Sequence, residues 1–484
     1  MQKKVKLENK YFFNLLVTIF LIFGSRYFLE FGAVTTYGSN ILGIFLGVIY
    51  GYCTIGMIIP SFMALIAMSF SGYGSMSTIL QGSFGNSTVI YIIAILILSA
   101  MLEKCGLADK IVHWMVTRKI AKGRPWVISF LFLFAAYIAA LFINAVPVTF
   151  ICWSLLSGLF ATVGYQRGDR WPMAIMFGVM FTATLGSCVP SFQISIVSNF
   201  GLLTAVSGGE YHLNPLNYML WAFLCSAALF AVYFIFMKYV LKPDVTLLKK
   251  EDLIKENQEA LTWEQKFTAA LFIIFVVGLL LPSLLPEGFF LKTFFTTIGD
   301  SGWSILITLV GIMVWHDGKP VYDFNEMFAK GVIWDIVLMI ATIFLIVGAI
   351  TEERTGIAKL IIQLVAPMQN ALPPFIFILA ISLVVILLCN FTNSVAVAYI
   401  FIPVMFMLSL DSEAYIDMMP FVGMTVFMGN LCFMMPSASI ISAIMYSKPE
   451  WIPKKYCYIF SVFSIISVYL IMMLIGMPLG KLVL

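Results

Sequence analysis

Apolar stretches of about 20 residues, the length with which a helix crosses a bilayer, follow one another along most of this 484-residue chain. Hydrophobic residues make up 61% of the sequence and charged residues 11%, against roughly 45–50% and 25% in soluble domains. So few charges cannot keep a chain of this size in water, whereas lipid accepts apolar side chains. The sequence therefore predicts an all-α polytopic membrane protein. The net charge of +4 is spread over loops, so no basic stripe is available for nucleic acid.

Two parts of the chain differ from simple spans. The intervals 127–208 and 371–447 are apolar throughout but contain four polar or proline-bearing breaks, at 144–149, 182–199, 390–394 and 436–442. Lipid cannot satisfy unpaired backbone groups, so such breaks must be buried in protein or line a wet cavity. The clearest uninterrupted spans are predicted at 11–31, 42–69 (two spans), 88–104, 216–241, 268–286, 298–315, 330–350 and 457–482.

Loop charges predict how the chain crosses the membrane. Lysines at the N-terminus place it in the cytoplasm by the positive-inside rule. Basic residues flank 127–163 on both sides, whereas acidic residues flank 374–409. The first segment is therefore predicted to be a re-entrant hairpin from the cytoplasm with its tip at Asn144. The second is predicted to be a hairpin from the outside, and the C-terminus is expected to be external.

An internal repeat agrees with this topology. The stretch ILSAMLEKCGLADKI (97–111) resembles IVGAITEERTGIAKL (346–360), and NAVPV from residue 144 matches NSVAV from residue 393. PSFQIS from residue 190 then matches PSASIIS from residue 436. Three landmarks in the same order, with opposite flanking charge, favour an inverted-topology repeat.

The repeat divides the chain into alternating scaffold and transport parts. The predicted parts are N-terminal scaffold helices (1–87), a first transport part (88–208), central scaffold helices (209–329), a second transport part (330–447) and a C-terminal helix (448–484). The first transport part contains the cytoplasmic hairpin 127–163 and a broken helix at 171–208. The second contains the external hairpin 374–409 and a broken helix at 417–447. A cytoplasmic linker, 242–267, lies within the central scaffold.

Inverted repeats with broken helices are typical of secondary transporters, which bind substrate near the bilayer midplane. Free N–H groups at a helix break attract anions, and free carbonyls attract cations. The predicted substrate-binding residues are Asn144, Thr149, Gln193, Asn390, Thr392, Asn393, Ser394, Ser439 and Ser442. The predicted Na⁺ ligands are Asn144, Gly186, Ser187, Thr392, Asn393 and Ser394. For any single Ser or Thr, a hydrogen bond to its own helix is the alternative interpretation.

At these breaks the sequence resembles the divalent anion/sodium symporter family of the ion transporter superfamily. CNFTNSVAVAYIFIPV keeps Phe391, Thr392 and Pro403 of the second hairpin-tip motif, and LFINAVPVTF keeps Asn144 of the first. CFMMPSASIISAI and TATLGSCVPSFQIS resemble the two broken-helix motifs. Neither Ser-Asn-Thr tip triplet is intact, and Asn390 stands where the family often has Glu. The resemblance implies an elevator-type transporter, usually a homodimer, with Na⁺ coupling and di- or tricarboxylate or sulfate substrates.

We therefore expect Na⁺-coupled symport of a small organic anion, with Na⁺ as the coupling ion and no organic cofactor. The alternatives are an H⁺-coupled carrier, a cation or oxyanion exchanger of the same superfamily, and a channel. The sequence has no HExxH motif and no Ser–Lys, Ser–His or His/Cys/Asp cluster within the apolar segments, so it predicts no enzyme. Short loops without long extensions favour a bacterial inner membrane as the location.

Overall fold

The computed structural model describes residues 2–24, 32–117, 123–249, 260–286, 288–411 and 416–484. Over these residues the chain is almost entirely helical, with one antiparallel pair of short strands, β1 (Trp315–His316) and β2 (Lys319–Pro320). Seven helical segments of the described chain are long and apolar enough to cross a membrane. A bent pair, 324–331 with 334–350, adds an eighth if it forms one span. An all-α polytopic membrane protein is thereby confirmed.

The uninterrupted spans predicted from hydropathy appear as helices close to their expected positions. The end of the first span (25–31) and part of the linker (250–259) lie outside the described residues. The helices before the first interrupted interval are α1 (Gln2–Ile19), η1 (Phe20–Gly24), α2 (Thr36–Thr54), α3 (Ile58–Phe70) and α4 (Met76–Phe84). The central helices are α11 (Pro215–Ile235), η4 (Phe236–Leu241), η5 (Thr246–Lys249), α12 (Trp263–Leu284), α13 (Phe290–Met313), α14 (Phe324–Glu326) and η6 (Met327–Gly331). The chain ends with α21 (Lys454–Ile471), η8 (Met472–Gly476) and α22 (Met477–Val483).

The same order of six helices occurs twice. The first set is α5 (Ser87–Lys104), α6 (Leu107–Val116), α7 (Pro125–Ala140), α8 (Ala145–Val163), α9 (Arg170–Ser187) and α10 (Ile194–Val206). The second is α15 (Trp334–Ile350), α16 (Ile357–Ala371), α17 (Pro374–Phe391), α18 (Ser394–Asp411), α19 (Met418–Asn430) and α20 (Ile440–Tyr446), with the short η7 (Glu353–Thr355) before α16. In both sets the second helix follows a glycine with positive φ, Gly106 (66°) and Gly356 (70°). The opposite orientation of the two sets in the membrane stays a prediction.

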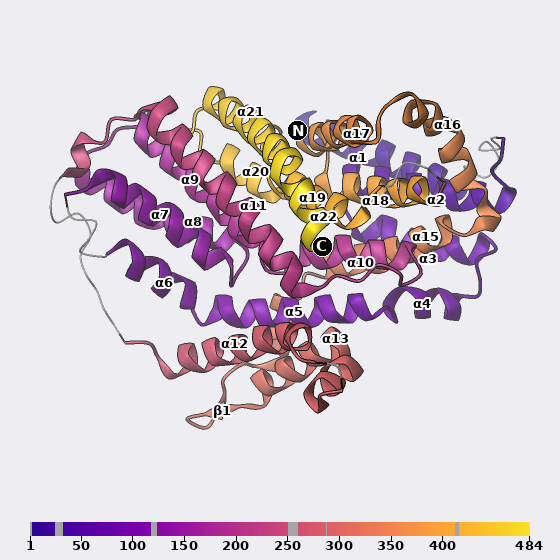
Figure 1. The fold of residues 1–484 in the computed structure, drawn as a ribbon, viewed down its shortest axis with the longest axis horizontal. Helices are drawn as coiled ribbons and strands as arrows, with labels where there is room; N and C mark the ends of the chain where they lie inside the picture. Colours follow the sequence, from indigo (N-terminus) through magenta and orange to yellow (C-terminus); the bar gives the residue numbers. More distant parts are fainter. Residues whose placement is uncertain (1, 25–31, 118–122, 250–259, 287, 412–415) are drawn as a thin grey trace.

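The two sets interlock through their broken helices. In each set the helical hairpin packs on the first half of its own broken helix: α7 and α8 pack on α9, and α17 and α18 on α19. The second halves cross over, because α10 packs against α18 and α20 packs against α8. Figure 1 shows α7, α8 and α9 together at one end of the molecule and α17, α18 and α19 nearer the other, with α10 alongside α18. Most contacts between the two sets are thus made by α10, the second half of the first broken helix.

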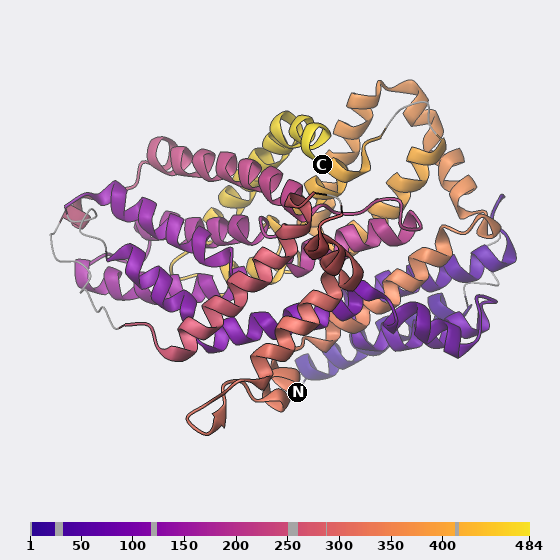
Figure 2. The same ribbon diagram turned by 60° about the horizontal axis from the view of Figure 1, so that its bottom comes forward.

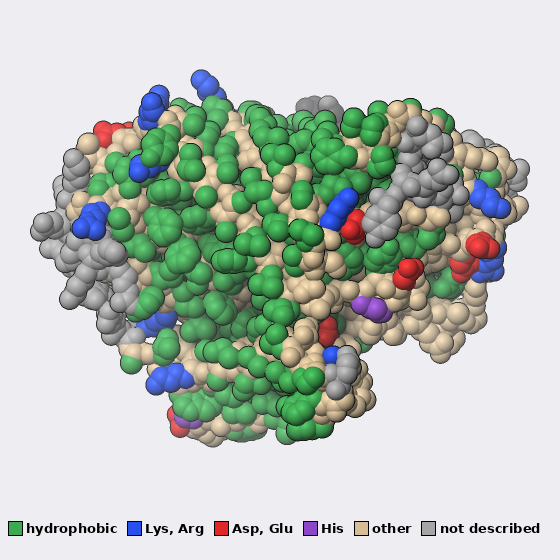
Figure 3. All heavy atoms as spheres, viewed as in Figure 1, with side chains coloured by type: hydrophobic (Ala, Val, Ile, Leu, Met, Phe, Trp, Pro, Cys, Tyr) green, Lys and Arg blue, Asp and Glu red, His purple; other side chains and the backbone are tan. Residues whose placement is uncertain are grey.

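A layer of two central helices covers one side of this arrangement. Helices α12 and α13 pack against each other and both contact α5. Figures 1 and 2 show this pair lying across α5 at the lower edge of the molecule. Much of the outer surface is apolar, and in Figure 3 hydrophobic side chains cover much of the visible face, with few charged groups among them. Such a distribution suits a lipid-facing surface.

Two helices of the broken-helix segments, α10 and α19, are too short to cross a bilayer alone. With a rise of 1.5 Å per residue, the 13 residues of α10 span about 20 Å of a hydrocarbon core about 30 Å thick. Helix α19 also has 13 residues. Each therefore needs a partner helix to complete the crossing, and the irregular backbone between the halves falls inside the protein.

We expect Gly356→Ala to lower the melting temperature of the protein markedly. A Cβ at this position would lie 1.9 Å from the Ala33 carbonyl oxygen, and the φ of +70° is itself unfavourable for alanine, by about 1–2 kcal/mol. Gly348→Ala is the matched control, because a Cβ there meets nothing within 4 Å and alanine favours a helix. Thermal unfolding in detergent measures both variants, and equal melting temperatures would contradict the close approach of the two segments.

Candidate functional site

The helices are interrupted at all four stretches that the sequence singles out. The hairpin turns lie at 141–144 and 392–393, and the broken helices are interrupted at 188–193 and 431–439. Helices α8, α10, α18 and α20 begin at these interruptions, whereas α7, α9, α17 and α19 end there. The interruptions thus bring together four helix N-termini and four C-termini from both halves of the chain.

The second hairpin is joined to the second break through Asn390. This side chain is completely buried. Its Oδ1 accepts hydrogen bonds from the backbone N–H groups of Phe433 (3.0 Å) and Met434 (3.3 Å), and its Nδ2 donates to the Ile386 carbonyl (2.9 Å). The backbone N–H of Ser394 donates to the Ala438 carbonyl at 3.4 Å. Asn390 therefore supplies a hydrogen-bond acceptor to two backbone N–H groups of the break, which are not bonded within a helix.

Side chains of α20 satisfy the carbonyls of the same break. The hydroxyl of Ser439 donates to the Cys432 carbonyl (3.1 Å), and that of Ser442 donates to the Met435 carbonyl (2.7 Å). Ser439 also accepts from the Ser442 N–H at 3.1 Å. Ser442 is fully buried and Ser439 is half-buried. Both predicted substrate residues hold the irregular backbone in place, and Ser439 keeps part of its surface open.

The two broken helices meet through a residue that the sequence reasoning missed. Asn430, the last residue of α19, donates from Nδ2 to the Ser195 hydroxyl at the start of α10, at 3.1 Å. Ser195 belongs to the polar residues of the first break that the sequence pattern reveals, but Asn430 precedes the second break and carries no such signal of its own. The predicted internal repeat offers a signal, because Gly429–Asn430 precedes the second break as Gly186–Ser187 precedes the first. Both pairs end a helix immediately before a break.

At the first hairpin tip, Asn144 caps α8. It is exposed, and its Oδ1 accepts from the Val146 N–H at 3.0 Å. Thr149 lies one turn inside α8 rather than at the tip, buried and donating to the Ala145 carbonyl at 2.8 Å. Thr149 therefore bonds to its own helix, which is the alternative interpretation given above for single Ser and Thr residues.

The remaining residues of the first broken helix have mixed surroundings. A Cβ on Gly186 would lie 2.2 Å from the Tyr137 carbonyl oxygen, so this glycine permits close packing of α9 on α7. Ser187 donates to the Thr184 carbonyl at 2.9 Å. Gln193 precedes α10 and is half-buried, and its side chain does not cap the helix. The Gln193 amide is therefore available to a ligand.

At the second tip, Asn393 repeats the role of Asn144. Its Oδ1 accepts from the N–H groups of Val395 (3.0 Å) and Ala396 (3.4 Å). The neighbouring Thr392 is exposed and donates to the Leu388 carbonyl at 2.8 Å. Ser394 is buried beside the second break.

The first tip and the first break meet on an aromatic residue of α12. The Phe272 ring packs edge-on against Phe142 at the tip and Phe192 in the break, with centroid distances of 5.9 and 5.3 Å. Contacts therefore run from the first tip through the first break and the Ser195–Asn430 bond to the second break and tip. Asn144 and Asn393 do not hydrogen-bond to each other in the part of the chain that the structure describes.

The arrangement is suited to ions of both signs without a charged side chain. The N–H groups of Ile194 and Ser195, which open α10, make no hydrogen bond within the described residues, and helix N-termini attract anions. Helices α7, α9, α17 and α19 end at the interruptions, and the free carbonyls of helix C-termini favour cations. The four breaks contain no Lys, Arg, Asp or Glu. The described residues include no group of three His, Cys, Asp or Glu side chains able to hold a metal ion.

A cavity of about 410 Å³ reaches the first break. It is lined by Ser191 of the break, by the face of α10 that carries Gly201 and Thr204, and by the start of α5. The far wall is residues 296–301 of α13, where Gly299 has a non-helical backbone. This volume lies within the range of about 300–1,000 Å³ that small-molecule sites occupy. A small molecule could approach the first break along α10.

Comparison with known proteins agrees with this geometry. The sequence matches the citrate transporter family over residues 41–427. The crystal structure of the Alcanivorax borkumensis YdaH transporter is similar with a TM-score of 0.55 at 13% identity, over 83% of this chain and 89% of that chain. Neisseria gonorrhoeae MtrF, described with a class of antimetabolite efflux pumps, gives 0.52 at 13% identity, over 95% and 97%. At such identities the likeness shows the fold alone. No curated protein matches the sequence.

Proposed function

The chain belongs to the citrate transporter family of the ion transporter superfamily, and we propose that it carries citrate or a related di- or tricarboxylate by Na⁺-coupled symport. It is a multi-pass membrane transporter, not an enzyme. The resemblance of the break motifs to those of the divalent anion/sodium symporter family supports Na⁺ coupling, an elevator mechanism and a homodimer. Short loops support a location in a bacterial inner membrane. These four features belong to the proposal.

The observation that carries the proposal is that eight helix ends, four from each half of the chain, lie at uncharged interruptions that hydrogen bonds and ring contacts join to one another. Carboxylates are stabilised by free N–H groups at helix N-termini, and Na⁺ by free carbonyls at C-termini. Because the two sets of ends lie in one region, bound substrate and bound cation would each lower the cost of binding the other. Such mutual stabilisation is the thermodynamic basis of coupling.

Within this region we assign the substrate to the two hairpin tips and the residues that face them. Asn144 and Asn393 contact the carboxylates, helped by Thr392, Gln193 and Ser439. Gly186, Ser187 and Ser394 contribute oxygen ligands to Na⁺ together with the tip asparagines. Asn390, Ser442 and Thr149 have smaller roles in binding, because their side chains are completely buried and their polar atoms bond to backbone groups.

The bond between Asn430 and Ser195 is expected to set the distance between the two breaks. Asn430→Ala and Ser195→Ala should each weaken the apparent Kd for citrate, measured by thermal stabilisation, by about fivefold, because a hydrogen bond contributes about 1 kcal/mol. The double variant should be no worse than either single variant, since both remove the same interaction. Additive losses would show that the two residues act separately.

Proton coupling is the second candidate, and the altered tip triplets favour it. Ile143 and Ala145 flank Asn144 where the symporter family has Ser and Thr, so fewer hydroxyl ligands remain for Na⁺. Uptake into proteoliposomes under an inward Na⁺ gradient, or under a pH gradient with choline replacing Na⁺, separates the two. We expect accumulation with Na⁺ alone. Accumulation only with the pH gradient would show that protons, and not Na⁺, are the coupling ion.

A further inference from the structure

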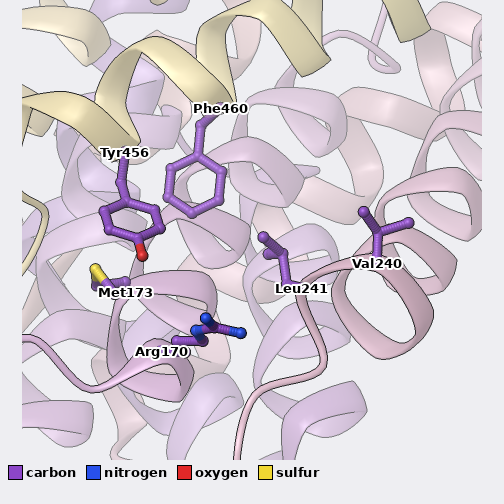
Figure 4. A pocket seen from close by; sticks show the side chains of 6 residues that line it. All are labelled: Arg170, Met173, Val240, Leu241, Tyr456 and Phe460. Carbon is purple, nitrogen blue, oxygen red and sulfur yellow. The ribbon is translucent and has the colours of Figure 1, made fainter.

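A second cavity lies outside the four breaks, near the ends of three helices. It has a volume of about 170 Å³ and is lined by Arg170 and Met173 of α9, Val240 and Leu241 of η4, and Tyr456 and Phe460 of α21. Figure 4 shows these side chains facing a common space, with the Tyr456 hydroxyl directed toward Met173 and Arg170. None of its lining residues belongs to an interruption, so the cavity is separate from the proposed transport site.

The cavity combines one cation with an apolar wall. Arg170 is exposed and makes no ion pair or side-chain hydrogen bond within the described residues. The Phe460 ring stacks on Phe177 of α9 at 4.4 Å between centroids and 5° between planes, which fixes the wall between α9 and α21. On the outer side Val240 is 66% exposed. A ligand here would meet a guanidinium and a phenol at one end and lipid-facing apolar surface at the other.

The surroundings are positively charged. Basic residues near these three helix ends outnumber acidic ones: Arg167, Arg170, Lys238, Lys242, Lys454 and Lys455 against Asp169, Asp244 and Glu450. The Asp169 carboxylate accepts the Gln166 N–H at 2.8 Å, and Lys238 lies 5.7 Å from the centre of the Trp126 ring. Figure 3 shows Lys and Arg groups gathered over the neighbouring ends of α11 and α21. Such a rim attracts anions.

Size and location narrow the class of anion. The volume is below the about 300–1,000 Å³ of sites that enclose whole metabolites, so it suits a phosphate group rather than a tricarboxylate. The loop charges predict that this edge is cytoplasmic, and the cytoplasmic leaflet carries anionic lipids that basic juxtamembrane residues attract. Arginine is well suited to phosphate because its planar donors match two oxygens.

We propose that this cavity binds the phosphate of an anionic phospholipid from the cytoplasmic leaflet. Arg170 and Tyr456 donate hydrogen bonds to the phosphate, and an acyl chain lies over Val240 and Leu241. The lipid thereby connects α9 of the first repeat to α11 and α21. This site is independent of the substrate and the coupling ion.

Thermal unfolding of the full-length protein in detergent tests the proposal with three probes: short-chain phosphatidylglycerol, phosphatidylcholine with the same chains, and glycerol 3-phosphate. We expect phosphatidylglycerol to raise the melting temperature and the other two to have little effect, because a ligand stabilises in proportion to its occupancy of the native state. Arg170→Gln should weaken the apparent affinity for phosphatidylglycerol at least about tenfold. Arg167→Gln is the matched control for the rim charge: it removes one basic group three residues away without changing the cavity lining, so it should weaken the affinity much less than Arg170→Gln.

Each other outcome decides against part or all of the proposal. Equal stabilisation by glycerol 3-phosphate would assign the cavity to a free phosphate compound instead of a lipid. Equal responses of the Arg170→Gln variant and the wild type would overturn the site, as would stabilisation by phosphatidylcholine of the same size. If Arg170→Gln does not fold, Val240→Glu serves instead: its exposed position tolerates replacement, and its carboxylate should repel the lipid phosphate.

Discussion

Replacing Asn144 or Asn393 by alanine is expected to reduce carboxylate uptake by about 10- to 100-fold while the protein stays folded. Each asparagine caps the helix that begins at a hairpin tip, and a lost cap costs only about 1 kcal/mol of stability. The loss of transport is larger because an amide that donates to a carboxylate contributes about 1.5–3 kcal/mol, or one to two factors of ten. Uptake into proteoliposomes measures transport, and thermal unfolding measures folding.

Asn86→Ala separates binding from capping. Asn86 caps α5 with the same geometry, accepting the N–H two residues later at 2.9 Å, but it lies at no interruption. Its replacement should cost similar stability and leave uptake close to normal. If uptake falls equally in all three variants, the effect comes from the lost caps. If uptake is normal in both tip variants, the assignment of the substrate to the tips is wrong.

Replacing Asn390 by leucine is expected to cause a much larger loss of stability than removing either tip cap. It leaves the N–H groups of the buried Phe433 and the half-buried Met434 without an acceptor. Each unsatisfied group costs about 1–3 kcal/mol, so the total is about 2–6 kcal/mol, comparable to the whole stability of many proteins. Thermal unfolding in detergent measures the loss. Thr392→Val is the control, because Thr392 is exposed and bonds only within its own helix.

The same variant shows whether Asn390 also touches the ligand. The sequence pattern places Asn390 among the substrate residues, whereas its surroundings favour a structural role. Replacing a residue that is only structural lowers the melting temperature but leaves unchanged the rise in melting temperature that saturating ligand produces. If the variant has normal stability but its melting temperature no longer rises with ligand, Asn390 contacts the ligand.

Hydropathy and charge are sufficient to predict the membrane class and the approximate position of every interruption. Lipid imposes one strong rule, that backbone groups be satisfied internally, so a polar or proline-bearing stretch inside an apolar run has few interpretations. The limits of the interruptions are predicted less accurately. The sequence pattern extends the first tip to Thr149, but α8 already begins at Ala145, because a single capping asparagine is enough to restart the helix.

The roles of individual polar residues cannot be read from the sequence. Asn390 and Asn393 are three residues apart, yet the first is buried against the second break and the second caps α18. The difference arises at Thr392, where an extended backbone (φ −126°, ψ −163°) ends α17. Asn430 escapes prediction because its partner, Ser195, lies 235 residues away in the chain. Such long-range pairs follow from tertiary packing and not from local pattern.

Ligand-dependent thermal stability of the purified protein bears on the proposed site without a transport assay. Citrate would be added with Na⁺ present and with Na⁺ replaced by choline, in wild type and in Asn393→Ala. We predict that Na⁺ alone raises the melting temperature, that citrate raises it further only when Na⁺ is present, and that the variant loses the citrate increment. The absence of stabilisation by citrate or any related carboxylate, with Na⁺ and at every pH tested, would contradict the proposal that the interruptions form an organic-anion site.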